Sequence, residues 1–247
     1  MTPNVVDPGR LMAHRGASLA RPENTLGAIR EADRQGAYWI EFDVSLLGDG
    51  TAVVHHDGTL DRCTNRTGSL SEIGIDDLPG IEAGPGEPLP TLDQVLDLLD
   101  ELGMFANLEM KSHDVPSARI AGVVADALRA RPWTDGRIIT SSFDLKALTV
   151  LRQILPAAAI AVLYYNPPSD WPHSVTDLSA AALHLHYTHL NQALLRQAES
   201  LEVDVRIFTA NEPQLLVPFR DLPLTGIITD HPPLFLKDPD WGAWVKR

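Results

Sequence analysis

The chain has 247 residues, of which 44% are hydrophobic and 21% are charged, and its formal net charge is −13. A chain of this length buries a full core, either as one large domain or as two small ones. The acidic balance, with no cluster of lysine and arginine, argues against nucleic acid as a partner, because proteins that bind the phosphate backbone usually carry a basic stripe. A small anionic substrate is compatible with this charge, since a bound cation dominates the field within a site.

Three features of the sequence bear on the cellular compartment. Cys63 is the one cysteine, so no disulfide forms within the chain, which fits a reducing compartment. Residues 1–10 are interrupted by two prolines and lack an apolar stretch of signal-peptide length. The longest apolar run, residues 157–165, is far too short to span a bilayer. We therefore expect a soluble, cytoplasmic monomer or homodimer with no stable membrane association.

Short apolar runs alternate with helical patterns along most of the chain. The expected strands are residues 11–14, 39–44, 52–56, 105–110, 137–141, 159–163, 181–185, 204–208 and 226–229. The expected helices are residues 25–35, 92–102, 145–154, 191–201 and 212–219. The best-marked helix has Thr91 and Gln94 at capping-box spacing before it and Gly103 after it. Alternation of strands and helices predicts parallel pairing and an α/β fold.

The nine expected strands fit the eight strands of a (β/α)₈ TIM barrel if residues 52–56 are a close companion of residues 39–44. The turn sequence Gly48-Asp49-Gly50 between the two supports that arrangement. The next stretch breaks the rhythm with glycine and proline, which indicates a small loop insertion after the second strand region, where such barrels carry substrate contacts. No linker divides the chain, so we expect a single barrel domain over residues 10–240, with the insertion at about 58–90.

Charged residues occur as pairs within two of the expected strands. Glu41 and Asp43 lie two positions apart, and so do Glu109 and Lys111. Residues two apart in a strand point to the same face. A parallel barrel strand has no solvated face, so an ordinary solvated surface explains these pairs poorly. The pairs therefore indicate a functional site inside the barrel mouth.

Histidines and an arginine at the ends of apolar runs complete this set. His14 and His56 could serve as general base and general acid near neutral pH. Arg15 offers a planar donor fork, and Lys111 a point charge, to the oxygens of a phosphoryl group. Carboxylates are hard oxygen ligands that suit Mg²⁺, Ca²⁺ or Mn²⁺ better than zinc. The residues together predict metal-assisted cleavage of a phosphodiester.

The order of several motifs resembles the glycerophosphodiester phosphodiesterase family, most closely its cytosolic bacterial type. The motifs are His14-Arg15-Gly16, Pro22-Glu23-Asn24-Thr25, Glu41-Phe42-Asp43, His56-Asp57, Glu109-Met110-Lys111, Ser141-Ser142-Phe143, Phe208-Thr209-Ala210-Asn211 and Gly226-Ile227-Ile228-Thr229-Asp230. They cover roughly residues 11–233. The combination is specific, whereas any single tripeptide is weak evidence.

The resemblance implies a (β/α)₈ barrel that hydrolyses glycerophosphodiesters to glycerol 3-phosphate and an alcohol. It also implies one divalent cation, Mg²⁺, Ca²⁺ or Mn²⁺, and a small-molecule substrate. Carried over by position, the metal ligands are Glu41, Asp43 and Glu109, the acid–base pair is His14 and His56, and the substrate-binding residues are Arg15, Lys111 and Phe208. Phe208 stands where family members often have tryptophan or tyrosine, and its ring is expected to pack on the glycerol carbons.

Residues next to these motifs have structural interpretations. His55 points away from His56 and is expected to be structural, whereas Asp57 is expected to orient His56 or to fix its loop. Glu23 and Asn24 are expected to tie the first loop to the helix that follows it.

Two later segments also favour a structural interpretation. His184, His186 and His189 lack nearby carboxylates and cysteines, so positions in the packing or on the surface are favoured over a second metal site. Residues 164–168 and Trp171 are expected to form a loop after a strand.

Two alternatives to this function remain open. The first is a lysophospholipase D-type phosphodiesterase that acts on lysophospholipids, which would favour an apolar loop facing a membrane, unlike the glycine- and aspartate-rich insertion here. The second is a non-catalytic barrel that binds phosphodiesters or metal, and such a protein would be expected to lack a histidine or a ligand, whereas none is missing.

Overall fold

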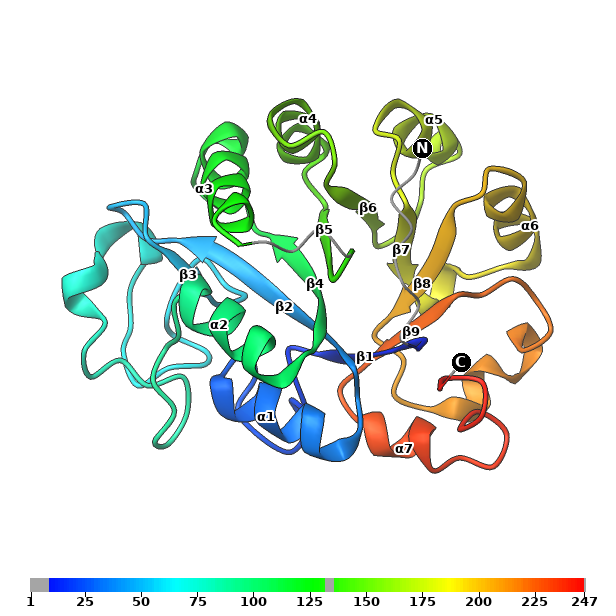
Figure 1. The fold of residues 1–247 in the computed structure, drawn as a ribbon, viewed down its shortest axis with the longest axis horizontal. Coiled ribbons are helices and arrows are strands. Elements are labelled where there is room, and N and C mark those ends of the chain that lie inside the picture. The colour runs from blue at the N-terminus through cyan, green and yellow to red at the C-terminus, as the bar shows by residue number, and fades with distance from the viewer. Residues whose placement is uncertain (1–8, 132–135, 247) are drawn as a thin grey trace.

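The structure is a computed structural model that describes residues 9–131 and 136–246. Residues 1–8 lie outside that description. The expectation that residues 1–10 hold no signal peptide therefore falls mainly on residues that the structure does not describe. Eight parallel strands close into a barrel, and one further strand pairs with the end of the second of them (Figure 1). The strands are β1 (Leu11–His14), β2 (Trp39–Leu46), β3 (Ala52–Val54), β4 (Phe105–Met110), β5 (Ile138–Ser142), β6 (Ala159–Tyr164), β7 (Ala182–His186), β8 (Asp204–Phe208) and β9 (Gly226–Thr229).

The barrel closes because β1 pairs with both β2 and β9. The other neighbours follow the order β9-β8-β7-β6-β5-β4-β2, and each of these pairs is parallel. β3 runs antiparallel to β2 and stands outside the closed ring. The prediction of an α/β barrel with a companion strand after the second strand is therefore confirmed, although this strand ends at Val54 rather than at residue 56.

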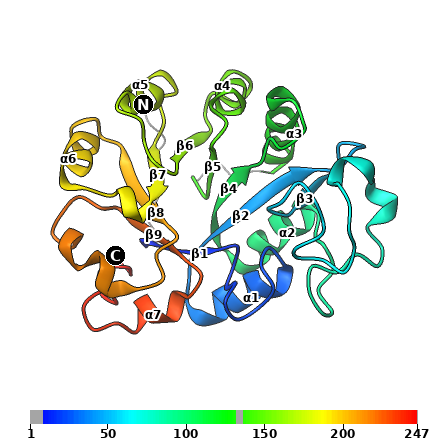
Figure 2. The same ribbon diagram turned by 180° about the vertical axis from the view of Figure 1, so that it is seen from behind.

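Helices cover the outside of the barrel, as the opposite views in Figure 1 and Figure 2 show. The α-helices are α1 (Leu26–Gln35), α2 (Leu92–Leu102), α3 (Ser117–Arg129), α4 (Leu145–Ile154), α5 (Trp171–Asp177), α6 (Gln192–Ser200) and α7 (Pro232–Leu236). Short 3₁₀ segments are η1 (Leu70–Glu72), η2 (Ile75–Asp77), η3 (Tyr187–His189) and η4 (Pro213–Phe219). Within the described ranges, no helix reaches the length and apolar character that a bilayer crossing requires.

Two local predictions were wrong, and proline explains both. Trp171 is not in a loop but begins α5 with its indole buried, and Pro172 occupies the first turn, where the helix needs no N–H from it. Residues 213–219 are a 3₁₀ segment rather than an α-helix, and Pro218 inside it has no N–H to donate.

The ends of α1 and α2 follow the signals in the sequence. Thr25 accepts a hydrogen bond from the Ala28 N–H at the start of α1. The Thr91 hydroxyl accepts from the Gln94 N–H, and the Gln94 side chain accepts in turn from the Thr91 N–H, so the predicted capping box is present. Gly103 ends α2 in the left-handed conformation, with φ of 67°, which glycine adopts at little cost.

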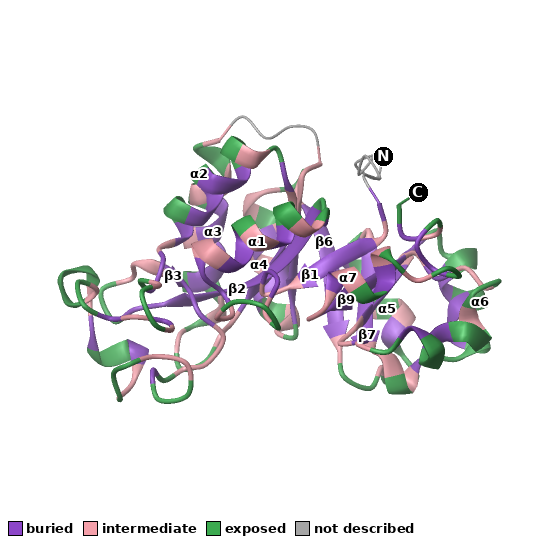
Figure 3. Ribbon diagram, turned by 90° about the horizontal axis from the view of Figure 1, so that it is seen from below, coloured by how far each residue is buried: buried purple, intermediate pink, exposed green. Residues whose placement is uncertain are grey.

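The two faces of β2 explain how the barrel positions charged groups. Ile40, Phe42 and Val44 are buried in the layer between the strands and the helices. The alternating residues Glu41 and Asp43 consequently point into the barrel interior. Figure 3 shows the strands coloured mainly as buried, with the exposed residues on the helices and loops.

The segment between β3 and α2, residues 55–91, has a small core of its own. Its buried apolar side chains pack on one another and on residues near β3, and these residues are Leu47, Val53, Leu60, Leu70, Ile73, Ile81, Ala83 and Leu89. The segment is therefore folded against the barrel and can hold side chains in fixed positions.

Removing the cap of α2 tests whether the box stabilises the fold. Thr91→Ala leaves the Gln94 N–H without its side-chain acceptor, so we expect a loss of about 1 kcal/mol and a fall in Tm of about 2–4 °C. The matched control is Thr149→Ala on the exposed surface of α4, which removes only a bond to the carbonyl of Leu145. Equal Tm values for the two variants in a thermal melt would contradict a stabilising role for the box.

Candidate active site

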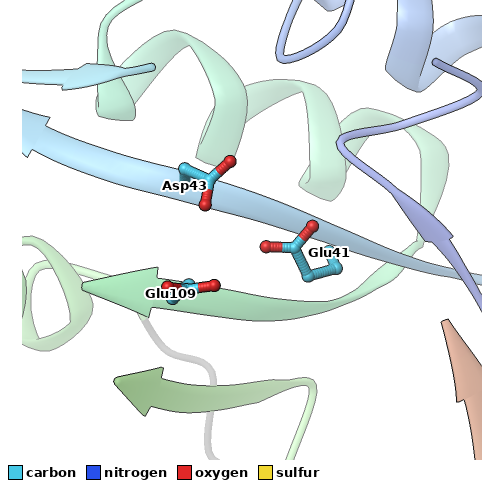
Figure 4. Close-up of side chains that lie close together, drawn as sticks. All are labelled: Glu41, Asp43 and Glu109. Atoms are coloured by element: carbon cyan, nitrogen blue, oxygen red, sulfur yellow. The ribbon is translucent and has the colours of Figure 1, made fainter. Parts of the chain in front are cut away.

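Three carboxylates from two neighbouring strands lie close together. Glu41 and Asp43 extend from β2 and Glu109 extends from β4 (Figure 4). Asp43 and Glu109 are register partners across the parallel pair. One oxygen of each carboxylate lies within 4.8 Å of those of the other two, and all three residues are buried. The structure therefore brings together the three residues that the sequence analysis grouped as metal ligands.

Two cations balance part of this buried charge. Lys111 Nζ lies 3.0 Å from Asp43 Oδ1 and donates to Glu109 Oε1 at 2.5 Å, and Arg15 Nε lies 3.2 Å from Asp43 Oδ2. Burial alone would raise the pKa of Asp43, yet Lys111 and Arg15 lower it well below its usual range. Asp43 is therefore ionised at neutral pH.

The charge balance is incomplete at the other two carboxylates. Burial raises the pKa of Glu109 to about 7, although Lys111 opposes that rise. Burial also raises the pKa of Glu41 well above its usual range, and the charges of Asp43 and Glu109 raise it further. Glu41 Oε1 is buried and has no hydrogen-bond partner in the described part of the chain. An all-oxygen set with one unmatched buried oxygen fits a hard divalent cation, which would replace the missing positive charge.

His14, at the end of β1, is held by a carboxylate. His14 Nδ1 lies 2.6 Å from Asp230 Oδ1, and His14 Nε2 lies 3.9 Å from Glu41 Oε2. Asp230 also accepts hydrogen bonds from Ser18 Oγ at 3.0 Å and Asn211 Nδ2 at 2.7 Å. Burial would raise the pKa of Asp230, but His14 and these hydrogen bonds lower it to about 2. Because an ionised carboxylate only accepts hydrogen bonds, Asp230 holds a ring proton on His14 Nδ1.

His56, just after β3, has the same arrangement. His56 Nδ1 lies 2.6 Å from Asp57 Oδ1, so Asp57 orients the ring as the sequence analysis expected. Burial lowers the pKa of His56, Lys111 and Arg15 lower it further, and Asp43 opposes them. These interactions place His56 within the electrostatic field of the carboxylate cluster. His55 is buried on the other side and pairs its Nε2 with the Thr59 carbonyl, as expected for a structural residue.

Arg15 and its partners correct one expectation about the first loop. The Arg15 backbone N–H donates to Glu41 Oε2 at 3.1 Å, and its Nη1 donates to Glu23 Oε1 at 2.7 Å. Asn24 Nδ2 donates to Asp43 Oδ2 at 2.8 Å. Glu23 and Asn24 thus connect the loop to the charged cluster and not to the following helix, because the Thr25 hydroxyl already caps that helix.

Aromatic side chains line the mouth next to the charged cluster. Phe208 at the end of β8 lies edge-on to Phe143, with ring centroids 6.0 Å apart, and Lys111 Nζ lies 6.0 Å from the Phe143 ring. His186 also lies edge-on to Phe208 and stacks on Tyr165 at 4.3 Å. The Phe143 ring is therefore a common neighbour of the Phe208 ring and the Lys111 ammonium.

The three later histidines lie in different surroundings, and only His184 is buried in the packing. His184 is fully buried on β7, and burial lowers its pKa well below the usual range. His189 packs edge-on against Tyr165. Among the described residues, these histidines belong to no group of potential metal ligands.

The sequence analysis missed the groups that hold His14 in place and the arginine that binds Asp57. Asp230 and Asn211 were noted within motifs but without a role, although Asp230 follows β9, whose neighbour β1 ends at His14. Adjacency of the first and last strands of a closed barrel was the available signal. Arg62, which bonds both Asp57 and Glu23, gave no comparable signal because it lies outside any regular element.

Known proteins share this fold and these motifs. A family model described as the glycerophosphoryl diester phosphodiesterase family matches residues 14–234. A glycerophosphodiester phosphodiesterase of Caldanaerobacter subterraneus is 31% identical over an alignment of 229 residues, and the match covers 90% of this chain and 94% of that protein. One of Bacillus subtilis is 28% identical and covers 95% of this chain and 88% of its own length.

Solved structures agree with the sequence comparison. A phosphodiesterase of Oleispira antarctica, solved with the product sn-glycerol-3-phosphate, superimposes with a TM-score of 0.88 at 28% identity, covering 92% of this chain and 95% of that one. The glycerophosphodiester phosphodiesterase of Thermotoga maritima gives a TM-score of 0.77 at 26% identity and covers 93% and 97% of the two chains. The chain therefore belongs to the glycerophosphoryl diester phosphodiesterase family of phosphoric diester hydrolases.

Proposed function

We propose that this protein hydrolyses glycerophosphodiesters to glycerol 3-phosphate and an alcohol. The observation that carries the proposal is the pair of histidines, each held through Nδ1 by an aspartate, beside a buried cluster of three carboxylates. The Oleispira antarctica relative, which holds sn-glycerol-3-phosphate, supports the same product here. We further propose one barrel domain over residues 10–240, of the cytosolic bacterial type, with a small-molecule substrate and no nucleic acid partner.

Glu41, Asp43 and Glu109 would hold one divalent cation. Their oxygen-only set suits Mg²⁺, Ca²⁺ or Mn²⁺, and three carboxylates completed by water serve any of these ions. When bound, such an ion supplies positive charge to a phosphoryl oxygen and orients the reacting groups.

His14 and His56 would exchange protons with the substrate through Nε2. One ring takes a proton from the attacking hydroxyl, and the other gives a proton to the departing alcohol oxygen. Asp230 and Asp57 keep both Nδ1 protons in place, so the tautomer and the direction of each ring are set before substrate binds.

Arg15 and Lys111 would stabilise the phosphoryl charge, and Phe208 would pack on the glycerol carbons. Lys111 is held between Asp43 and Glu109, so its ammonium is directed at the cluster before substrate binds. The glycerol arm carries a hydroxyl next to the phosphorus, and its oxygen could attack to form a cyclic phosphate as the bond to the alcohol breaks. Water then opens the ring, with the proton roles of the histidines reversed.

Neutralising Glu41 tests the carboxylate cluster. Glu41→Gln keeps the shape but removes one charge, so we expect turnover of glycerophosphocholine to fall about 10²-fold or more together with the calorimetric affinity for divalent cations. In chelator its Tm should equal or exceed that of the wild type, because ionised Glu41 is opposed by burial. Glu199→Gln, at an exposed position of α6, is the control. Wild-type turnover by Glu41→Gln in chelator would show that the metal assignment is wrong.

Removing the imidazoles tests the acid–base assignment. His14→Ala and His56→Ala should each lower kcat by about 10²–10⁴-fold with the fold intact, and the double variant should lose far less than the product of the two. His173→Ala, an exposed histidine on α5, should match the wild type in kcat and circular dichroism. A rate that stays flat between about pH 5 and 9 would count against histidine catalysis.

Substrate analogues test the neighbouring-hydroxyl route. Glycerophospho-choline, -ethanolamine and -glycerol should all be cleaved with modest preferences, since this route needs little recognition of the departing alcohol. A 2-deoxyglycerol analogue should be a poor substrate, and phosphorus NMR should detect a cyclic phosphate only with the natural arm. Comparable rates on the deoxy analogue would instead favour direct attack by water.

A further inference from the structure

Arg62, in the segment between β3 and α2, binds two carboxylates at once. Its Nε and Nη2 donate to the two oxygens of Asp57 at 2.6 and 3.0 Å. Its Nη1 and Nη2 donate to the two oxygens of Glu23 at 3.0 and 2.8 Å. One planar guanidinium thus forms two bidentate pairs, a geometry that a lysine ammonium cannot reproduce.

Each of these carboxylates holds a residue of the candidate active site. Asp57 accepts from His56 Nδ1 at 2.6 Å, and Glu23 Oε1 accepts from Arg15 Nη1 at 2.7 Å. A continuous chain of charged hydrogen bonds therefore runs from His56 through Arg62 to Arg15, which itself contacts the carboxylate cluster. Its members come from the loops after β1 and β3.

We infer that Arg62 is a positioning residue that fixes His56 and Arg15 relative to each other through Asp57 and Glu23. The expected effect of Arg62 on turnover rests on the proposed function. Within the described part of the chain, Arg62 hydrogen-bonds to neither His56 nor Arg15, so it acts on them through the two carboxylates. In its absence, Asp57 and Glu23 would lose their shared donor and repel each other.

The acidity of the two carboxylates agrees with this geometry. The hydrogen bonds from Arg62 are the main reason that the pKa of Asp57 lies well below its usual range. Burial would raise the pKa of Glu23, but Arg62 and Arg15 lower it to about 2. Both groups therefore stay ionised and keep accepting hydrogen bonds throughout the neutral range.

A role as a staple for the segment is the competing explanation. The segment does not depend on Arg62 alone, because Leu60 is fully buried in its small core and the Leu60 N–H donates to the Gly68 carbonyl. Arg66 provides a comparison, since it is about as exposed as Arg62 and pairs with Asp77, away from His56 and Arg15.

The test compares Arg62→Ala with Arg66→Ala in the full-length protein. We expect Arg62→Ala to lower kcat for glycerophosphocholine about 10–10²-fold, because small misplacements of catalytic groups have effects of that size. Arg66→Ala should keep the wild-type kcat. Arg62→Lys should fall between the wild type and Arg62→Ala. Combining Arg62→Ala with Asp57→Asn should add little to either single loss.

Chemical rescue separates positioning from stapling. The Arg62 side chain is about half exposed and borders a cleft of about 620 Å³, so free guanidinium can reach the vacated place. Millimolar guanidinium should restore several-fold activity to Arg62→Ala and none to His56→Ala. If Arg62→Ala lost activity together with a large fall in Tm, and guanidinium restored none of that activity, the inference would be overturned.

Histidine-ring NMR provides a readout that does not need activity. The His56 Nδ1–H signal, assigned with His56→Ala, should be present in the wild type and Arg66→Ala but lost or broadened in Arg62→Ala. An unchanged signal in Arg62→Ala would overturn the inference. If the wild type cleaved no glycerophosphodiester, the proposed function would fail, while this signal would still decide the role of Arg62.

Discussion

The burial of three carboxylates within 4.8 Å of one another is the constraint on which the rest of the site depends. Two partly buried cationic side chains, Lys111 and Arg15, balance Asp43 and part of Glu109. Glu41 keeps a buried oxygen without a partner in the described residues, so the protein alone leaves the cluster short of positive charge. Such an arrangement is unfavourable unless another cation completes it. The shortage of charge is the physical reason for assigning a metal to this place.

The residues that position His14 and His56 come from distant parts of the chain. From the C-terminal side, Asp230 reaches His14 because β9 lies next to β1 in the closed barrel. From the segment after β3, Arg62 reaches Asp57 and Glu23. In both cases a carboxylate binds Nδ1 of an imidazole, and the proposed acid–base role falls to Nε2. The barrel strands thus provide the three buried carboxylates, and the loops after the strands provide the aspartates that orient the two histidines.

Much of this could be predicted from the sequence where the signal was local. The two-residue period of β2 placed Glu41 and Asp43 on the face opposite Ile40 and Phe42, and the structure has them inside the barrel. The capping box at Thr91 depends on residues three positions apart and is present as expected.

What could not be predicted depended on long-range geometry. His14 and Asp230 are separated by 216 positions and meet only because the barrel closes. Glu23 and Asn24 were assigned to a helix end, whereas charge in the folded site attracts them to Arg15 and Asp43. The start of α5 was missed for a local reason, because the buried Trp171 lies among prolines that are typical of loops.

The most direct test of the central claim is the release of glycerol 3-phosphate from glycerophosphocholine by the wild-type protein, measured in chelator and after a divalent cation is restored. If the buried carboxylates hold a catalytic cation, release should stop in chelator and return with Mg²⁺, Ca²⁺ or Mn²⁺. Undiminished release in excess chelator would contradict the account, because catalysis would then need no divalent cation at the three carboxylates.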